Sequence, residues 1–240
     1  MNLHGGVFLG EVSRSRKRDI CLGTWNVRSL YRAGSLTAMA RELARYKLDL
    51  VGVQEVRWDK WGTVRAGDYI SFYRKGNENH QLGTGFFVHQ RIASAIKRVE
   101  FVSNRVSYIV MRGHWCNIIV LNVHAPSEEK SDESKDSFYE ELEQVFDHFP
   151  KYHMKILLDF NAKVGREKIF KPTIGNESLH QYCNDNGVRI FDFATSKNLV
   201  VKSTMFPHRN IHKYTWTSPD GKTHNQIDHI LIDRRRHSSI

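Results

Sequence analysis

The sequence predicts an α/β fold for a chain of 240 residues, and three observations lead to this class. A strand pattern, a helical pattern and a second strand pattern follow one another near the N-terminus. Consecutive strand patterns fill the middle, and two further helical patterns flank strands in the last third. A chain of this length can bury one large core. No apolar run approaches the roughly 20 residues of a membrane-spanning helix, so we expect no membrane association.

An α/β alternation opens the folded part of the chain. Residues 20–25 form an apolar run that predicts a buried strand, and residues 48–53 form a second that ends on Gln54 and Glu55. Between them, Ser35 is placed to cap a helix. The apolar residues of this helix recur at helical spacing: Leu36, Met39, Ala40 and Leu43.

The middle of the chain is rich in strands. Four runs are β-branched or aromatic and are separated by Gly, Asn and polar turns: residues 69–73, 85–88, 105–111 and 117–123. No helical pattern lies between them. Consecutive strands of this kind favour antiparallel pairing and argue against a purely parallel sheet.

Helices and strands alternate again after the middle. The acidic segment 127–136 is interpreted as a solvated loop that leads into a helix, which ends near residue 149 before Pro150. A second helix is expected at residues 186–197. The remaining apolar runs predict strands at residues 155–159, 199–201, 214–217 and 226–232.

The charge balance favours a polyanionic partner. Lys and Arg number 36 against 26 Asp and Glu, a net charge of +10. Such an excess neutralises phosphates and releases counterions, although it also serves solubility alone.

Residues 1–18 are interpreted as a flexible arm and residues 19–240 as one domain. The basic run at residues 14–18 is either a nuclear address or a tail that contacts DNA.

The three cysteines indicate a reducing compartment. Cys21, Cys116 and Cys183 are widely separated and show no Cys-x-x-Cys spacing, so buried free thiols are predicted in preference to zinc ligands or disulfides. The N-terminus lacks the pattern of a secretory signal. We therefore expect an intracellular protein, located in the nucleus.

Polar residues terminate several of the apolar runs. They are Asn26, Glu55, Asn122, His124, Asp159 and Asn161, with Asp228 inside the run 226–232. Each alone has an ordinary explanation, such as a turn-forming Asn or a solvated acid. Together they offer carboxylate and amide oxygens to a hard cation, because loops at strand ends gather functional groups. Mg²⁺, or alternatively Mn²⁺, bound in this way suits phosphodiester hydrolysis.

Six short motifs resemble those of the endonuclease/exonuclease/phosphatase superfamily, in the same order. They are Thr-Trp-Asn at 24–26, Val-Gln-Glu at 53–55, Asn-Val-His-Ala-Pro at 122–126, Asp-Phe-Asn-Ala-Lys-Val-Gly at 159–165, Thr-Trp at 215–216 and Ile-Asp-His-Ile-Leu at 227–231. Within the superfamily, the chain resembles endonuclease domains of non-LTR retrotransposons and craniofacial development protein 2-like proteins. The resemblance implies a four-layer α/β/β/α sandwich in which two sheets pack face to face.

The resemblance also implies roles for individual residues. Glu55 is the expected principal Mg²⁺ ligand, with Asn26 beside it. Asp159 is expected to take part in metal binding and to orient or deprotonate the attacking water, and Asn161 to hold the scissile phosphate. The remaining expected roles are phosphate contact by His124, support of a catalytic histidine by Asp228, and substrate binding by Asn122, Arg28, Lys163 and Thr215.

Several features depart from the family pattern. His124 replaces a tyrosine of many relatives, Arg28 lies where apurinic endonucleases tend to carry an acid, and Leu158 replaces a glycine that permits close backbone approach. The family's terminal Asp-His pair does not follow Asp228 before residue 240, so we expect a domain that lacks its final strand and is impaired in activity. His229 is a poor substitute, because adjacent strand residues face opposite sides, and His237 lacks a preceding acid.

Three hypotheses about function follow. The first is Mg²⁺-dependent cleavage of DNA by a monomeric, retrotransposon-derived endonuclease domain. The second is a catalytically silent domain that binds nucleic acid or a protein, and the third is cleavage of a phosphoinositide or phospholipid head group. Candidate backbone contacts are Arg32, Arg57, Lys60, Lys163, Arg166 and Arg209; Trp58 and Trp61 either stack on bases or pack internally.

Overall fold

The computed structural model of the chain describes residues 6–9, 20–30, 34–58, 61–74 and 82–239. These residues divide into an N-terminal unit, drawn from 8–123 with 239, and a C-terminal unit, drawn from 6–7 and 124–238. The short strand β1 (Gly6–Leu9) lies inside the expected arm, so these four residues are ordered as a strand. Their Val-Phe-Leu run has high β-propensity. The basic run 14–18, Arg32 and Lys60 lie outside the described residues.

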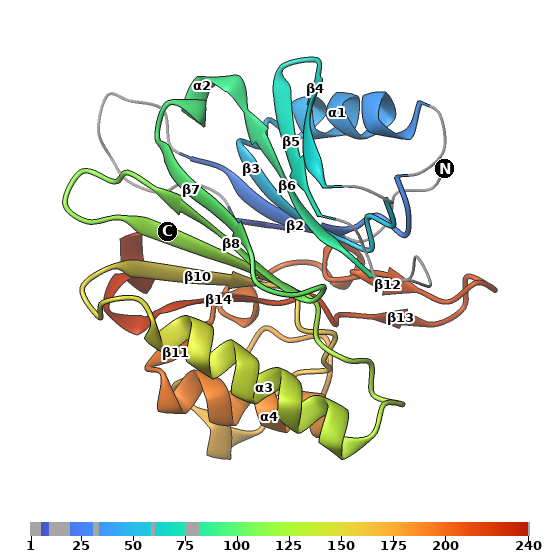
Figure 1. The fold of residues 1–240 in the computed structure, drawn as a ribbon. Helices are drawn as coiled ribbons and strands as arrows, with labels where there is room; N and C mark the ends of the chain where they lie inside the picture. Colours follow the sequence, from blue (N-terminus) through green and yellow to red (C-terminus); the bar gives the residue numbers. More distant parts are fainter. Residues whose placement is uncertain (1–5, 10–19, 31–33, 59–60, 75–81, 240) are drawn as a thin grey trace. The chain divides into compact units, whose positions relative to one another are not determined.

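One sheet of the N-terminal unit is built around a parallel pair. β2 (Leu22–Asn26) and β3 (Leu50–Gln54) run parallel, with Asn26 opposite Gln54. β6 (Thr84–His89), β5 (Tyr69–Tyr73) and β4 (Gly62–Ala66) extend the sheet antiparallel to one another. The crossover that a parallel pair requires is α1 (Ser35–Arg45), which buries Met39, Ala40 and Leu43 and lies beside this sheet in Figure 1.

The start of α1 differs from the expectation. Gly34, with φ of 82°, is the N-cap, and Ser35 is the first helical residue and is buried. Glycine adopts this left-handed conformation without the cost that a side chain would impose. Ser35 therefore lies on the packed face of the helix instead of capping it.

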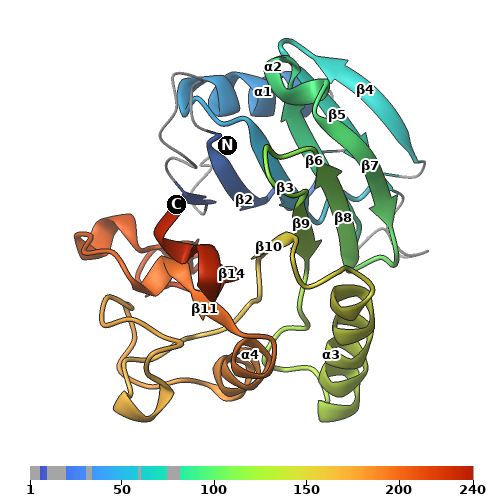
Figure 2. The same ribbon diagram turned by 90° about the vertical axis from the view of Figure 1, so that its left-hand side faces the viewer.

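A second layer of the N-terminal unit is an antiparallel ladder. β7 (Ile96–Phe101), β8 (Val106–Met111) and β9 (Ile118–Val123) pair in that order, and α2 (Gln90–Ala93) precedes β7. β9 packs on the first sheet, since the Asn122 amide in β9 donates to the carbonyl oxygens of Val53 and Gly85 at 3.0 and 2.9 Å. The antiparallel pairing expected for the middle of the chain is confirmed, and β7 and β8 are seen as neighbouring arrows in Figure 2.

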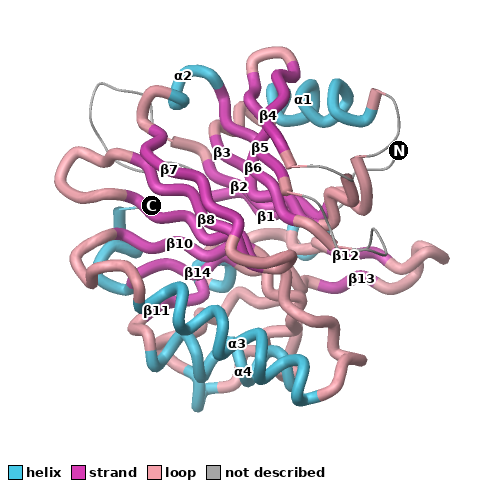
Figure 3. The backbone as a smooth tube through the Cα atoms, viewed as in Figure 1, coloured by secondary structure: helices cyan, strands magenta, loops and turns pink. Residues whose placement is uncertain are grey.

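The C-terminal unit combines a small sheet with two helices. β14 (Ile230–Asp233) pairs antiparallel with both β10 (Met154–Leu158) and β11 (Leu199–Val201). The helices α3 (Asp132–Asp147) and α4 (Asp185–Ser196) lie side by side, with the rings of Phe146 and Phe193 5.8 Å apart (Figure 3). The short β12 (Trp216–Thr217) and β13 (His224–Asn225) form a separate hairpin. Four 3₁₀ turns complete the unit: Lys168–Phe170, Lys202–Thr204, Asn210–His212 and Arg234–Ser239.

The acidic segment before α3 is solvent-exposed as expected, apart from Lys135, but part of it is helical and not a loop. α3 begins at Asp132, inside that segment. Asp132 and Asp136 form ion pairs with Arg189 of α4, and Lys135 pairs with Asp185 at 2.9 Å. These ion pairs join the two helices, and they could not be predicted from residues 127–136 alone because Arg189 and Asp185 lie about 50 positions further along the chain.

The expectations for the cysteines and for the last strand have different outcomes. The three cysteines are free, as predicted, but each is only partly buried. β14 starts at Ile230, four residues later than expected, because residues 226–229 hydrogen-bond to neighbouring loops instead of a strand. Among the described residues, none of the helices has the length and apolar character needed to cross a membrane.

Candidate active site

Several predicted site residues occupy turns with unusual backbone geometry. Glu55, Asp159 and Asn161 directly follow β3 and β10 and have positive φ angles of 55°, 67° and 54°. Residues other than glycine reach this region at a free-energy cost of about 1–3 kcal/mol and do so most often at functional sites. The strained turns are therefore evidence for a site that the surrounding structure holds in place.

In the N-terminal unit, the parallel pairing of β2 and β3 brings Asn26 and Glu55 together. Nδ2 of Asn26 donates to Oε1 of Glu55 at 2.8 Å, and Arg57 donates to Oε2 at 2.5 Å. The backbone N–H of Arg28 donates to Oδ1 of Asn26 at 3.1 Å, while the Arg28 side chain is exposed. In this arrangement Asn26 orients the Glu55 carboxylate.

The chemistry of this pair fits a hard divalent cation. A magnesium ion is held by one or two carboxylates, with water and substrate phosphate completing the octahedron. Glu55 supplies one carboxylate that is still 19% exposed. The described residues include no cluster of three or more His, Cys, Asp or Glu able to hold a metal.

Asn122 does not reach the surface. Its side chain is fully buried in the N-terminal unit, where Nδ2 donates to Val53 and Gly85 and Oδ1 accepts from the Gln54 amide. The sequence placed Asn122 among the substrate contacts. Because the amide is enclosed and its bonds join two layers of sheet, we assign it a structural role instead.

The C-terminal unit brings three other candidates together. Nδ1 of His124 lies 3.7 Å from Oδ2 of Asp159, and both side chains are almost fully buried. Asp228 is adjacent: burial, followed by the charge of Asp159, raises the pKa of Asp228 well above the usual range for an aspartate. Two carboxyl groups and an imidazole thus lie together inside the C-terminal unit.

Hydrogen bonds between two backbone segments hold these residues in place. The N–H groups of Asp159 and Ala162 donate to the carbonyl oxygens of His229 and Ile227 at 3.1 and 2.9 Å. The hydroxyl of buried Thr215 accepts from the N–H groups of Ile227 and Asp228 at 2.9 and 3.1 Å. Thr215, expected to contact substrate, thus fixes the turn that carries Asp228.

His229 and His237, the two histidines considered as substitutes for the family's terminal histidine, have other surroundings. His229 is fully buried, and its ring contacts Ser203 Oγ at 2.9 Å and the Ala162 carbonyl oxygen at 3.0 Å. Burial lowers the pKa of His229 to about 4. Adjacent residues Asp228 and His229 therefore face different surroundings, and His237 lies in the 3₁₀ turn Arg234–Ser239.

The candidate DNA contacts have varied surroundings. Arg28, Arg166 and Arg209 are exposed, and Arg166 also donates to the Ser178 carbonyl oxygen at 2.6 Å. Trp58 packs edge-on against Tyr73 at 4.0 Å, whereas Trp61 is 82% exposed. Leu158 is fully buried in β10, so its side chain fills the interior.

The sequence of the chain matches a known family over almost its whole length. The match to the Endonuclease/Exonuclease/phosphatase family covers residues 23–239. The chain belongs to this family. Craniofacial development protein 2 of Bos taurus is 31% identical over 234 residues, which are 96% of this chain and 39% of the relative. Craniofacial development protein 2 of Tragulus javanicus is 32% identical over 228 residues, which are 95% of this chain and 39% of the relative. The chain thus spans well under half the length of these curated relatives.

Several solved structures share the fold. An AP endonuclease from Archaeoglobus fulgidus superposes with a TM-score of 0.61 at 16% identity, covering 90% of this chain and 88% of the other. The endonuclease domain of TRAS1, a telomere-specific non-LTR retrotransposon, gives a TM-score of 0.57 at 13% identity, covering 87% and 82%. These likenesses confirm the α/β sandwich class expected from the motifs.

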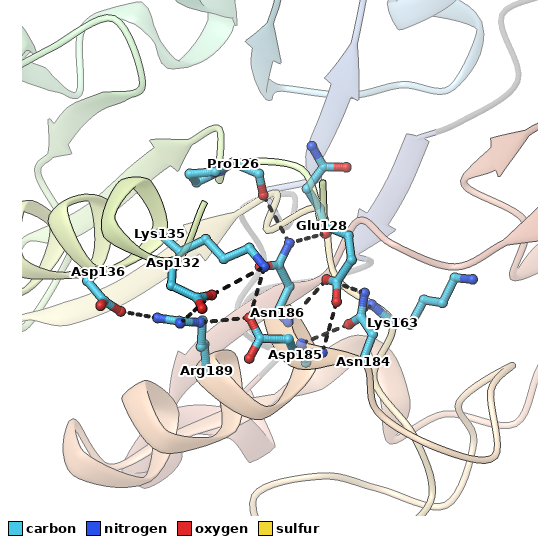
Figure 4. Close-up of polar contacts among 12 residues, drawn as sticks. Pro126, Glu128, Asp132, Lys135, Asp136, Lys163, Asn184, Asp185, Asn186 and Arg189 are labelled. Atoms are coloured by element: carbon cyan, nitrogen blue, oxygen red, sulfur yellow. Dashed lines mark hydrogen bonds and ion pairs between the residues drawn. The ribbon is translucent and has the colours of Figure 1, made fainter. Parts of the chain in front are cut away.

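The sequence patterns missed a set of residues at the start of α4. Asn184, Asp185 and Asn186 bind the Glu128 carboxylate, and Asn184 also accepts from the Lys163 backbone N–H at 3.0 Å (Figure 4). The signal was present, because Asn is a preferred residue at a helix N-cap. What the sequence does not show is which loops the helix start contacts.

Proposed function

We propose that this family member is a divalent-metal-dependent endonuclease domain that cleaves DNA phosphodiester bonds. The observation that carries the proposal is the buried group in the C-terminal unit, where the Asp159 carboxyl lies beside His124 and Asp228. Membership of a family of endonucleases, exonucleases and phosphatases supports a phosphoester substrate. The retrotransposon endonuclease domain and the AP endonuclease among its structural relatives favour DNA.

Each residue then has a defined task. Glu55, oriented by Asn26, would hold Mg²⁺ or Mn²⁺, which polarises the phosphoryl oxygen and stabilises the leaving oxygen. Asp159 accepts a proton from the attacking water and orients it, while neighbouring Asp228 restrains the Asp159 side chain. Asn161 and His124 donate hydrogen bonds to the scissile phosphate.

The charge of the chain supports nucleic acid as partner. Its net charge of +10 favours binding to a polyanion in a salt-dependent way. Exposed Arg28, Arg166 and Arg209, together with the partly exposed Lys163, are the proposed backbone contacts. A structural relative, TDP2 of D. rerio, has been solved with a single-stranded DNA product, at a TM-score of 0.56 and 14% identity over 88% of this chain and 82% of the other. We further propose a retrotransposon origin and a nuclear location.

The test is nicking of supercoiled plasmid with Mg²⁺ and with EDTA. The wild-type chain is expected to nick only with Mg²⁺, and Asp159→Asn to lose this activity. Asp192→Asn, the same change on the exposed side of α4, serves as the matched control and should retain it. Salt-sensitive DNA binding without any Mg²⁺-dependent product would replace the proposal with a catalytically silent binding domain.

A further inference from the structure

Asn186 is an enclosed polar residue at the start of α4. It lies in the first turn of the helix and only 1% of it is exposed. A buried amide in a helix is costly unless its hydrogen bonds are made. Its contacts therefore indicate what the residue does.

The amide of Asn186 joins two loops that carry site residues. From the same nitrogen, Nδ2, it donates to the Pro126 carbonyl oxygen at 2.9 Å and to the Asn161 carbonyl oxygen at 3.0 Å. Pro126 lies two residues after His124. Asn161 lies two residues after Asp159, and its own side chain reaches back to the Ala125 carbonyl oxygen at 3.3 Å.

The surrounding contacts fix the position of this amide. Lys163 and Asn184 exchange a pair of hydrogen bonds: Lys163 N–H donates to Asn184 Oδ1 at 3.0 Å, and Asn184 N–H donates to the Lys163 carbonyl oxygen at 3.1 Å. The Glu128 carboxylate accepts from the Asn186 backbone N–H at 3.3 Å, close to the helix N-terminus. Figure 4 shows Asn186 at the centre of these contacts, between Pro126 and Glu128 above it and Asp185 beside it.

We propose that Asn186 is a positioning residue that sets the placement of the His124 loop relative to the Asp159–Asn161 turn. The turn has positive φ angles at both Asp159 and Asn161, so it needs external contacts to stay in that form. Asn186 supplies one directly, at the carbonyl oxygen of Asn161. A catalytic role for the two loops rests on the proposed endonuclease function, whereas their placement by Asn186 does not.

The experiment compares two variants of Asn186 with a matched control. Asn186→Leu has similar size and removes both donated bonds, and Asn186→Ser keeps one hydroxyl donor in case the leucine variant does not fold. Ile190→Val, at a fully buried position one turn along α4, weakens the helix packing without touching either loop. All three are made in the full chain and compared at equal fractions folded.

Backbone hydrogen exchange measures placement without reference to activity. In wild-type protein Ala162 and Lys163 donate to Ile227 and Asn184. Both Asn186 variants should speed exchange at these two amides while the later turns of α4 stay protected, and Ile190→Val should not. Equal acceleration in Ile190→Val, or unchanged exchange in the Asn186 variants, would overturn the proposal.

Steady-state nicking measures the consequence at the site. Asn186→Leu should lower kcat by about 10²-fold, the effect expected of a misplacement near 1 Å, with KM for DNA within about twofold because Asn186 makes no contact with substrate. An unchanged kcat despite faster exchange would overturn the role at the site. If the wild-type chain does not nick DNA at all, the endonuclease proposal fails, and the exchange data alone decide whether Asn186 places the loops.

Discussion

Nδ1 of His124 lies 3.7 Å from Oδ2 of Asp159, although the two residues are 35 positions apart in the chain. His124 follows β9 and Asp159 follows β10, and their imidazole and carboxyl groups lie next to each other in the protein interior. A buried carboxylate keeps an imidazole oriented and stabilises its protonated form. The pair therefore suits contact with a phosphate whose negative charge increases during cleavage.

The first prediction is that His124→Leu lowers the nicking rate by about 10²–10³-fold, the usual loss when one donor to a developing charge is removed. Single-turnover nicking of plasmid DNA measures the effect. His208→Leu, at an exposed histidine, is the control and should leave the rate unchanged. A wild-type rate in His124→Leu would exclude the phosphate contact.

Local sequence patterns were sufficient to predict the main strands and the polar residues at their ends. Residues 20–25 and 48–53 contain β2 and β3 almost as predicted, and Asn26 and Glu55 follow from where these runs end. β7 was missed, because its charged residues interrupt the alternation of an edge strand. Strand ends are local properties, and they can be read from a single segment of sequence.

Hydrogen bonds between residues distant in sequence could not be predicted from local sequence patterns. Thr215 fixes Asp228 from 13 positions away, and Asn186 reaches Pro126 across 60 positions. Both residues have ordinary local patterns, a polar residue before a short strand and an Asn at a helix start. Their roles arise only when the tertiary fold brings carbonyl and amide groups of other segments to them.

The second prediction concerns metal affinity in the N-terminal unit. Asn26→Ala removes the hydrogen bond that orients Glu55, and it should raise the Mg²⁺ concentration for half-maximal nicking by about 10–100-fold. Glu55→Gln should raise it further, because it removes the carboxylate itself. Mg²⁺ titration of the nicking rate provides the measurement.

Glu42→Gln is the matched control for this titration, since Glu42 is a partly exposed acid on α1 paired with Arg45. Its Mg²⁺ requirement should equal that of the wild type. If all three variants shift alike, the effect comes from net charge and Glu55 is not the ligand.

The third prediction is an acid-induced loss of stability caused by His229. The pKa of this buried histidine falls from 6.5 to about 4 in the folded chain. Below about pH 6.5 the His229 imidazole binds a proton in the unfolded chain but not in the folded chain. The free energy of unfolding should therefore be unaffected by His229 above this pH and fall by up to about 3 kcal/mol as the pH drops towards 4.

Urea unfolding at several pH values between 7.5 and 4 tests this dependence. His229→Gln cannot gain a proton and should flatten the curve, although it lowers stability at neutral pH by disturbing the contacts to Ser203 and Ala162. His208→Gln, at an exposed position, should keep the wild-type slope. A slope that persists in His229→Gln would assign the acid sensitivity to other groups.

The fourth prediction concerns Gly187, the residue after Asn186. A Cβ atom built there would lie 2.1 Å from the Lys163 carbonyl oxygen, so the helix start cannot stay this close to the loop with a side chain present. Alanine favours a helix by about 1 kcal/mol over glycine, but such a clash with backbone commonly costs about 1–3 kcal/mol. Gly187→Ala should therefore destabilise the chain in urea unfolding and, because it moves α4 away from Lys163, also slow nicking.

Val188→Ala, at the neighbouring exposed position, should do neither. A more stable Gly187→Ala protein with full activity would show that this close approach is dispensable.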